Sequence, residues 1–170
     1  MKRIILFLFS AQLSQLCAQE IVRPTDSLLI SGKIKKEWLF TQRDLDTFHT
    51  VPVGDVQITN HLGVQKGIAK NMKGIPVKAL LDRALMDAAN PKLLSEFYFT
   101  FIASDNYKTV FSWNEIFNTE TGNHLFIITE KDGKKIKDTD DRILFMATAD
   151  FRTGRRYIKG LNRIIVSRVN

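Results

Sequence analysis

Positively charged side chains gather near the end of the chain, in residues 150–163, where an anionic group could be bound. The segment contains four cations and a glycine within eight residues, namely Arg152, Gly154, Arg155, Arg156 and Lys159. Arginine offers a fork of N–H donors to an oxyanion, lysine offers a point charge, and glycine permits a tight backbone turn. The pattern indicates a cradle for a phosphate-like group. An ordinary basic surface loop is the alternative.

The other side chains with reactive groups form no motif of a known enzyme site. The three histidines, His49, His61 and His124, are too dispersed to indicate a metal site by their spacing. The sequence contains neither a phosphate-binding loop of the Walker type nor the Gly-x-Ser-x-Gly turn of serine hydrolases. Asp105 could act as an acid or base, but its place between Ser104 and Asn106 is typical of a turn. We therefore assign no catalytic residue and no metal ligand.

Residues 1–18 resemble a signal peptide that precedes the domain carrying these side chains. A short basic start and an apolar run over residues 4–9 are followed by small or polar residues as far as Ala18, after which we expect cleavage. The apolar run is much shorter than the roughly 20 residues that span a bilayer. Lipid attachment at Cys17 is the alternative, although the residue before it is bulky. We predict an exported protein, periplasmic or secreted, with no transmembrane segment after removal of the leader.

Removal of the leader leaves residues 19–170, enough for one domain that buries roughly 70% of the surface its unfolded chain exposes. Cys17 is the only cysteine, so no disulfide can form after cleavage and stability must come from the core. The chain has a net charge of +7, and its basic residues are scattered instead of concentrated in one arm. This distribution argues against nucleic acid binding and suits an anionic small molecule.

Strands outnumber helices in the pattern of apolar residues and turn signals. Helices are expected over residues 41–48, 76–90 and 112–118, the first and third with a capping signal at their start. Strands are expected over residues 27–34, 51–60, 97–102, 108–111, 124–129, 142–148 and 164–169. Residues 61–73 read as a loop or irregular hairpin. Because strands and helices do not alternate regularly, we predict a single α+β domain with a mixed β-sheet and short helices.

Five segments, in this order along the chain, carry a resemblance to a known family. They are Leu-Ile-Ser-Gly at 29–32, Ile-Thr-Asn at 58–60, Lys-Gly-Ile-Pro-Val-Lys-Ala-Leu-Leu at 73–81, Ala-Ser-Asp-Asn-Tyr at 103–107 and the closing segment 154–164. The set is similar to the molybdopterin-binding domain of the sulfite oxidase family and covers nearly all of residues 19–170. The resemblance implies that domain's fold and, as a possible cofactor, molybdopterin.

The resemblance also implies a loss at the metal. The family's cysteine, whose thiolate ligates molybdenum, corresponds to Asn60, and a neutral amide does not replace a soft anionic sulfur ligand. Gly160 stands where the family has a tryptophan. Arg156 and Lys159 correspond to two lysines that lie against the cofactor's phosphate and pterin. The family's usual oxygen-atom transfer is therefore not expected, whereas a site for an anionic ligand is.

We expect an exported, non-catalytic binding module that binds a pterin-type or other anionic ligand, or a protein partner. The implied ligand-binding residues are Asn60, His61, Gly154, Arg155, Arg156 and Lys159. They are expected to border one cavity together with residues 61–73. Two alternatives stay open: a molybdopterin-dependent oxidoreductase whose metal environment lacks cysteine, and a purely structural domain whose basic loop is only surface.

Overall fold

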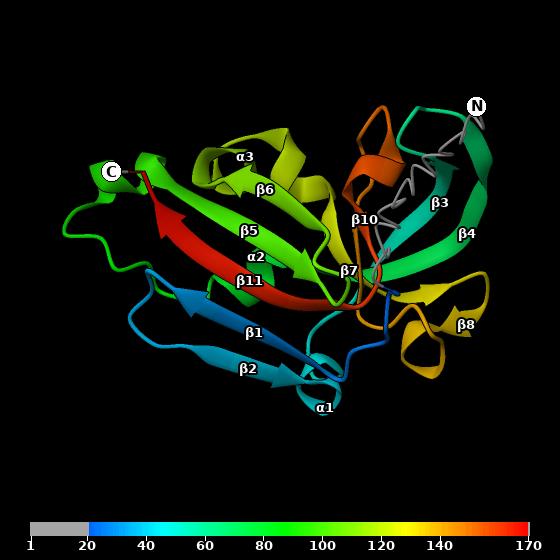
Figure 1. Ribbon diagram of the computed structural model, residues 1–170, viewed down its shortest axis with the longest axis horizontal. Coiled ribbons are helices and arrows are strands. Elements are labelled where there is room, and N and C mark those ends of the chain that lie inside the picture. Colours follow the sequence, from blue (N-terminus) through cyan, green and yellow to red (C-terminus); the bar gives the residue numbers. More distant parts are fainter. Residues whose placement is uncertain (1–20, 170) are drawn as a thin grey trace, which may run out of the picture.

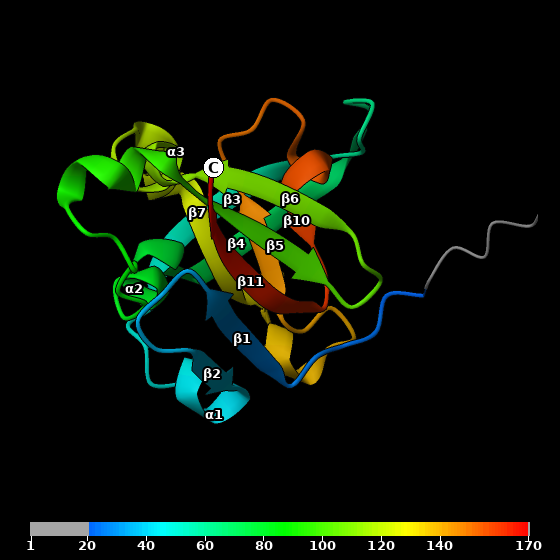
Figure 2. The same ribbon diagram turned by 60° about the vertical axis from the view of Figure 1, so that its left-hand side comes forward.

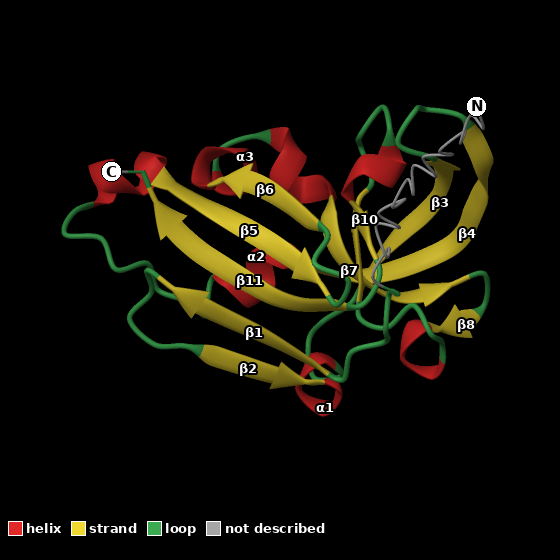
Figure 3. Ribbon diagram, in the orientation of Figure 1, coloured by secondary structure: helices red, strands yellow, loops and turns green. Residues whose placement is uncertain are grey.

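The computed structural model describes residues 21–169, which form two β-sheets with short helices around them (Figures 1 and 3). The strands are β1 (Ser27–Gly32), β2 (Trp38–Thr41), β3 (Val51–Thr59), β4 (Gln65–Pro76), β5 (Phe97–Ala103), β6 (Lys108–Ser112), β7 (Leu125–Lys131), β8 (Lys134–Lys135), β9 (Leu144–Ala147), β10 (Tyr157–Ile158) and β11 (Leu161–Arg168). The α-helices are α1 (Gln42–Leu45), α2 (Val77–Leu81) and α3 (Trp113–Phe117). The 3₁₀ helices are η1 (Pro91–Glu96), η2 (Glu120–His124), η3 (Ile136–Asp138) and η4 (Thr153–Arg156).

The two sheets differ in strand direction. The five-stranded sheet has the order β2-β1-β11-β5-β6, in which β1 and β11 are parallel and the other pairs antiparallel. The six-stranded sheet has the order β10-β9-β7-β4-β3, with β8 beside β7, and all its pairs are antiparallel. The predicted α+β class and single domain are confirmed. The predicted single mixed sheet is corrected to two sheets, of which only the first is mixed.

Aromatic side chains join the sheets. The ring of Phe101, on β5, lies 5.2 Å from that of Phe111, on β6, and 4.7 Å from that of Phe145, on β9 of the other sheet. All three are completely buried. The neighbours of Phe145 along β9, Leu144 and Met146, belong to a second buried cluster on the opposite face of the six-stranded sheet. Burial on both faces explains why this strand is apolar at every position.

Two short helices begin at the capping signals predicted from the sequence. Thr41 accepts the N–H of Asp44 at the start of α1, and the Asp44 carboxylate accepts the N–H of Thr41 in return. Ser112 and Glu115 form the same reciprocal pair at the start of α3. Each pair satisfies N–H groups that have no partner within the helix.

The helix predicted over residues 76–90 is much shorter in the structure. It begins after Pro76 as expected, but α2 ends at Leu81. Beyond it the chain turns to pair with the connection between β1 and β2, through a bridge between Met86 and Ile34 and a hydrogen bond from Lys35 to the Leu85 carbonyl. These long-range contacts outweigh the helical periodicity of the sequence.

The region predicted as a loop or irregular hairpin, residues 61–73, is an irregular hairpin in which most residues belong to β4. Its pairing with β3 shifts register at three places. The strands β2 and β10 were not predicted, because each has few residues and no clear alternation. The predicted leader, residues 1–18, lies outside the described residues. Within residues 21–169, no helix combines the length and apolar character needed to cross a membrane.

Candidate functional site

The loop between β3 and β4 is held closed by Asn60. Its side-chain oxygen accepts the N–H groups of Leu62 and Val64, both at 2.9 Å. Its backbone N–H donates to the Val64 carbonyl at 2.9 Å, and its carbonyl accepts the N–H of Gly63 at 3.0 Å. Asparagine suits this role because its short side chain reaches backbone groups a few residues ahead. Asn60 therefore gives the loop a fixed shape.

The helix η4 is locked against the end of β3. The hydroxyl of Thr153 accepts the N–H of Thr59 at 2.9 Å and donates to the Gln57 carbonyl at 3.0 Å. A Cβ atom on Gly154 would lie 2.2 Å from the Thr59 carbonyl oxygen, so only glycine permits this approach. The sequence-predicted residues Asn60 and Gly154 are thus direct neighbours in space.

A pocket of about 490 Å³, which we call the Asn60 pocket, opens between the β3–β4 loop, η4 and the hairpin of β5 and β6. Asn60, His61, Gly154 and Lys159, four of the six predicted ligand-binding residues, line it, and Lys66 adds a second ammonium group. The expected cavity therefore exists. The binding of a cofactor by these residues remains a prediction.

The remaining walls of the pocket are mainly apolar and aromatic, apart from the hydroxyl of Thr59 and the carboxylate of Asp105. Ile58, Ala103 and Ile158 contribute aliphatic surface, and Tyr107 and Tyr157 contribute rings. Such walls, with a few polar groups at defined points, are typical of sites for small organic molecules.

Two contacts of the β5–β6 turn fix the mouth of the pocket. The Tyr107 hydroxyl donates to the Arg155 carbonyl at 2.6 Å. The Ser104 hydroxyl accepts the N–H of Arg23 at 2.8 Å and donates to the Arg23 carbonyl at 2.7 Å. A Cβ atom on Gly160 would lie 2.2 Å from that carbonyl oxygen, so the glycine makes room for the chain at Arg23.

Arg156 does not line the pocket. Its guanidinium donates to both carboxylate oxygens of Asp150, at 2.7 and 2.5 Å, and lies 3.4 Å from a carboxylate oxygen of Glu115. The same group stacks over the Phe111 ring, 4.4 Å from its centroid. The hydrogen bonds to Asp150 raise the pKa of Arg156 further above its already high value. Two carboxylates thus occupy the guanidinium N–H donors that we expected from the sequence to bind an oxyanion.

Lys159 lies in the pocket wall and is also paired. Its ammonium is 2.8 Å from one carboxylate oxygen of Asp141, and the Lys131 ammonium is 3.2 Å from the other. Burial by itself would raise the pKa of Asp141, but the hydrogen bonds and charges of the two lysines outweigh burial and lower it. Asp141 therefore stays ionised and neutralises part of the charge that Lys159 would present to a ligand.

Three other cationic or titratable groups near the pocket have no carboxylate partner. Within residues 21–169, Lys66, His61 and Arg155 form no ion pair, and all three are exposed. Arg155 uses one N–H to bind the His61 carbonyl at 3.0 Å. Of the two lysines that line the pocket, Lys66 is the one that forms no ion pair within residues 21–169, and the Asp105 carboxylate lines the same pocket.

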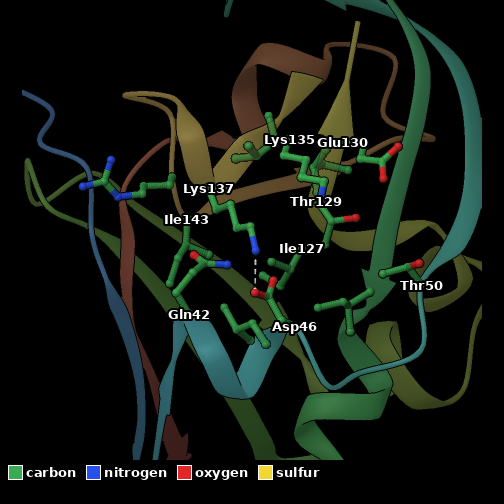
Figure 4. A pocket seen from close by; sticks show the side chains of 14 residues that line it. Gln42, Asp46, Thr50, Ile127, Thr129, Glu130, Lys135, Lys137 and Ile143 are labelled. Atoms are coloured by element: carbon green, nitrogen blue, oxygen red, sulfur yellow. Dashed lines mark hydrogen bonds and ion pairs between the residues drawn. The ribbon is translucent and has the colours of Figure 1, made fainter. Parts of the chain in front are cut away.

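A second pocket, of about 330 Å³, lies between α1, β7 and η3 (Figure 4). Aliphatic side chains, including Ile127 and Ile143, form part of its wall, and the ion pair of Lys137 with Asp46, 2.6 Å, crosses it. None of the six predicted ligand-binding residues lines it. We therefore take the Asn60 pocket as the candidate site.

Sequence patterns did not indicate Lys66, Tyr107, Tyr157 or Asp141 as parts of the site. Tyr107 could have been found, because it ends the Ala-Ser-Asp-Asn-Tyr segment of the resemblance. Lys66 lies in residues 61–73, which were expected to border the cavity, and Tyr157 lies in the closing segment 154–164 of the resemblance, whereas Asp141 comes from a segment without a distinctive motif. Among the described residues, no group of three or more His, Cys, Asp or Glu side chains is arranged to hold a metal ion.

Comparisons with known proteins support the fold. No family model matches the sequence, and no curated protein matches it. Among solved structures, the sulfane dehydrogenase SoxCD from Paracoccus pantotrophus is similar, with a TM-score of 0.60 and 16% sequence identity over 82% of this chain. The match spans 37% of that protein's chain. At this identity the likeness shows a shared fold, which is consistent with the sulfite oxidase-like fold expected from the sequence.

Proposed function

We propose that this protein is an exported, non-catalytic module that binds a small anionic ligand in the Asn60 pocket. The fold is similar to that of SoxCD, and by the resemblance Asn60 stands at the metal-ligand position, where its side chain holds the loop instead. The observation that carries the proposal is the bonding of the Asn60 side-chain oxygen to two backbone N–H groups. An oxygen engaged in this way is a poor donor to a metal, and a neutral amide is a weak ligand even when free.

The residues present do not fit the molybdenum of a molybdopterin cofactor. Cys17 is the only cysteine of the chain and belongs to the predicted leader, so the pocket contains no thiolate. Of the nearby carboxylates, Asp150 and Asp141 are paired with arginine and lysine side chains, and that of Asp105, which lines the pocket, accepts the N–H of Tyr107 at 3.0 Å. No step of a reaction is therefore assigned to a metal, and the oxidoreductase alternative has no residue to support it.

The pocket suits a flat, mainly apolar molecule with one anionic group. Tyr107 and Tyr157 offer ring surfaces, and Ile58 and Ile158 offer aliphatic contacts. Lys66 would bind the anion, because it forms no ion pair within residues 21–169, and Lys159 would contribute less, because its ammonium is already paired with Asp141. A pterin carboxylate has this combination of ring and charge.

Thermal stability in the presence of candidate ligands tests the proposal. The probes are a pterin carboxylate, a nucleoside monophosphate and inorganic phosphate. A ligand at about 100 times its Kd adds about 2.7 kcal/mol to the free energy of unfolding, which raises Tm by roughly 5 to 10 °C for a domain of this size. We expect the ring-bearing anions to raise Tm and inorganic phosphate to have little effect.

Two lysines on β4 provide a matched pair of variants. Lys66→Gln should abolish most of the ligand-induced rise in Tm, whereas Lys70→Gln, on the same strand and outside the pocket, should leave it unchanged. Equal effects of both variants would show that net charge, and not the pocket, attracts the ligand. Stoichiometric molybdenum in protein purified from a host that makes the cofactor would contradict the non-catalytic role.

Export is part of the proposal and has its own test. Mass spectrometry of the protein recovered from the periplasm or medium of an exporting host should show a chain that begins directly after Ala18. A chain that begins at Cys17 and carries a lipid would support anchoring instead, and an uncleaved cytoplasmic chain would refute export.

A further inference from the structure

Large apolar side chains are exposed on two adjacent loops beside the Asn60 pocket. Leu62 and Val64, in the β3–β4 loop, are 62% and 55% exposed, and Phe151, just before η4, is fully exposed. Single exposed apolar residues are common on soluble proteins and need no explanation. Three exposed apolar side chains on neighbouring loops do need an explanation, because contact between apolar surface and water is unfavourable.

The two loops touch each other and extend in one direction. A Cβ atom on Gly63 would lie 3.4 Å from the side chain of Arg152, and Arg155 donates to the His61 carbonyl. Figures 1 and 2, which differ by a turn about the vertical axis, both show the β3–β4 loop and the loop before η4 extending past the strands at the upper end of the molecule. We call Leu62, Val64, Phe151, Arg152 and Arg155 the loop-tip surface.

The cations of the loop-tip surface form no ion pairs within the described residues. Arg152 and Arg155 are exposed, and neither forms an ion pair with any residue in the range 21–169. Arg156, the next residue, forms two. The arginines on the exposed side of η4 are thus left with uncompensated positive charge.

The loops are held in shape without a partner. Asn60 closes the first loop with its hydrogen bonds, and Thr153 and the Arg156–Asp150 pair fix the second. Binding would therefore require little ordering of the backbone, which lowers its entropic cost.

We propose that the loop-tip surface binds the headgroup region of an anionic lipid bilayer. Apolar side chains would enter the boundary between headgroups and acyl chains, while the two arginines would remain at the lipid phosphates, as in other interfacial protein surfaces. A specific protein partner fits less well, since stable protein interfaces bury about 800 Å² per partner over a continuous patch. Here the apolar groups are separate points on two loop tips. This proposal does not depend on the ligand proposed for the pocket.

Vesicle flotation with the full chain tests the apolar contacts. Vesicles of phosphatidylcholine alone are compared with vesicles of equal parts phosphatidylcholine and phosphatidylglycerol. We expect binding to the anionic vesicles that weakens about tenfold in Phe151→Ala, because a ring worth a factor of ten or more on burial is removed. Leu39→Ala is the matched control, because Leu39 is 60% exposed on β2, a strand that Figure 1 shows at the lower side of the molecule, away from the β3–β4 loop. Any contribution of residues 1–20 is shared by all variants and cancels in their ratio.

A second pair of variants tests the charges. Each cation near an anionic bilayer contributes about fivefold to binding, so the double variant Arg152→Gln, Arg155→Gln should bind about 25-fold more weakly. The double variant Lys33→Gln, Lys35→Gln removes the same charge from the β1–β2 connection and should change binding little. Unchanged Tm values in all variants show that each is folded. Equal weakening by the two double variants, no effect of Phe151→Ala, or no binding of the folded wild type to anionic vesicles would each overturn the proposal, and the last would point to a protein partner.

Discussion

Replacing Arg156 with alanine distinguishes a residue of the fold from a residue of the ligand site. The sequence presents Arg156 as a phosphate ligand, while in the structure its guanidinium donates to Asp150, lies near Glu115 and stacks on Phe111. Only 24% of its side chain and 16% of that of Asp150 are exposed, so water would only partly replace the lost partner.

The magnitude follows from these contacts. Hydrogen bonds to charged groups contribute about 1.5 to 3 kcal/mol, and a cation over an aromatic ring contributes about 0.5 to 2 kcal/mol. Breaking a fully buried ion pair costs about 3 to 5 kcal/mol, and partial exposure here reduces that cost. We expect Arg156→Ala to lower the free energy of unfolding by about 2 to 4 kcal/mol and Tm by roughly 5 to 15 °C.

Urea unfolding followed by circular dichroism provides the measurement. A cycle with Arg156→Ala, Asp150→Ala and the double variant should give a coupling energy of about 1 to 3 kcal/mol, because the two side chains act as a pair. Arg155→Ala is the control, since Arg155 is exposed and has no carboxylate partner, and it should cost less than about 0.5 kcal/mol. If Arg156→Ala were as stable as Arg155→Ala and instead lost ligand binding, the assignment of Arg156 to the fold would be refuted.

Three further substitutions give distinct results. Gly160→Ala should lower stability by about 2 kcal/mol or more, because φ is +59° and the new Cβ would meet the Arg23 carbonyl, whereas Gly133→Ala, with φ of +74° and open space around it, should cost only about 1 kcal/mol in urea unfolding. Asn60→Ala should cost about 1 to 3 kcal/mol by leaving two N–H groups without their acceptor, while Asn60→Asp, which keeps an acceptor oxygen, should remain close to wild type in Tm. Because the pKa of Asp141 is lowered in the folded state, its contribution to the free energy of unfolding is fully present above its unfolded pKa and is lost as pH falls through the folded value. The stability difference between wild type and Asp141→Asn should therefore shrink below about pH 4. A difference that grows there would contradict the pairing of Asp141 with the two lysines.

Local signals in the sequence predicted the parts of the fold that depend on neighbours a few residues apart. Both capping pairs, at Thr41 and Ser112, join residues three positions apart and are visible without the fold. The length of α2 was not visible, since the bridge between Ile34 and Met86 ends the helical pattern from a distance. The division into two sheets likewise depends on packing between Phe101 and Phe145, which no local pattern reports.

The same limit applies to the site. Proximity of Asn60 and Gly154 followed from the family resemblance, which fixes the order of segments around a shared cavity. The state of each cation did not follow, because charge partners are set by the fold: Glu115 is 41 residues from Arg156 in the sequence. A cluster of cations along a chain therefore overstates the number of charges that are free to bind a ligand. Here the cation that is free in the pocket is Lys66, which lies outside the cluster in residues 152–159.

Asn60 links the loss of a metal ligand to the shape of the loop. By the resemblance, this position belongs to a cysteine that binds molybdenum, and sulfur is a weaker hydrogen-bond acceptor than an amide oxygen. In this chain the loop from Asn60 to Val64 turns so tightly that the N–H groups of Leu62 and Val64 both point at the side chain of residue 60. A loop closed in this way favours an amide oxygen over a metal-binding sulfur at residue 60. The shape of the β3–β4 loop and the proposed loss of catalysis therefore both depend on Asn60.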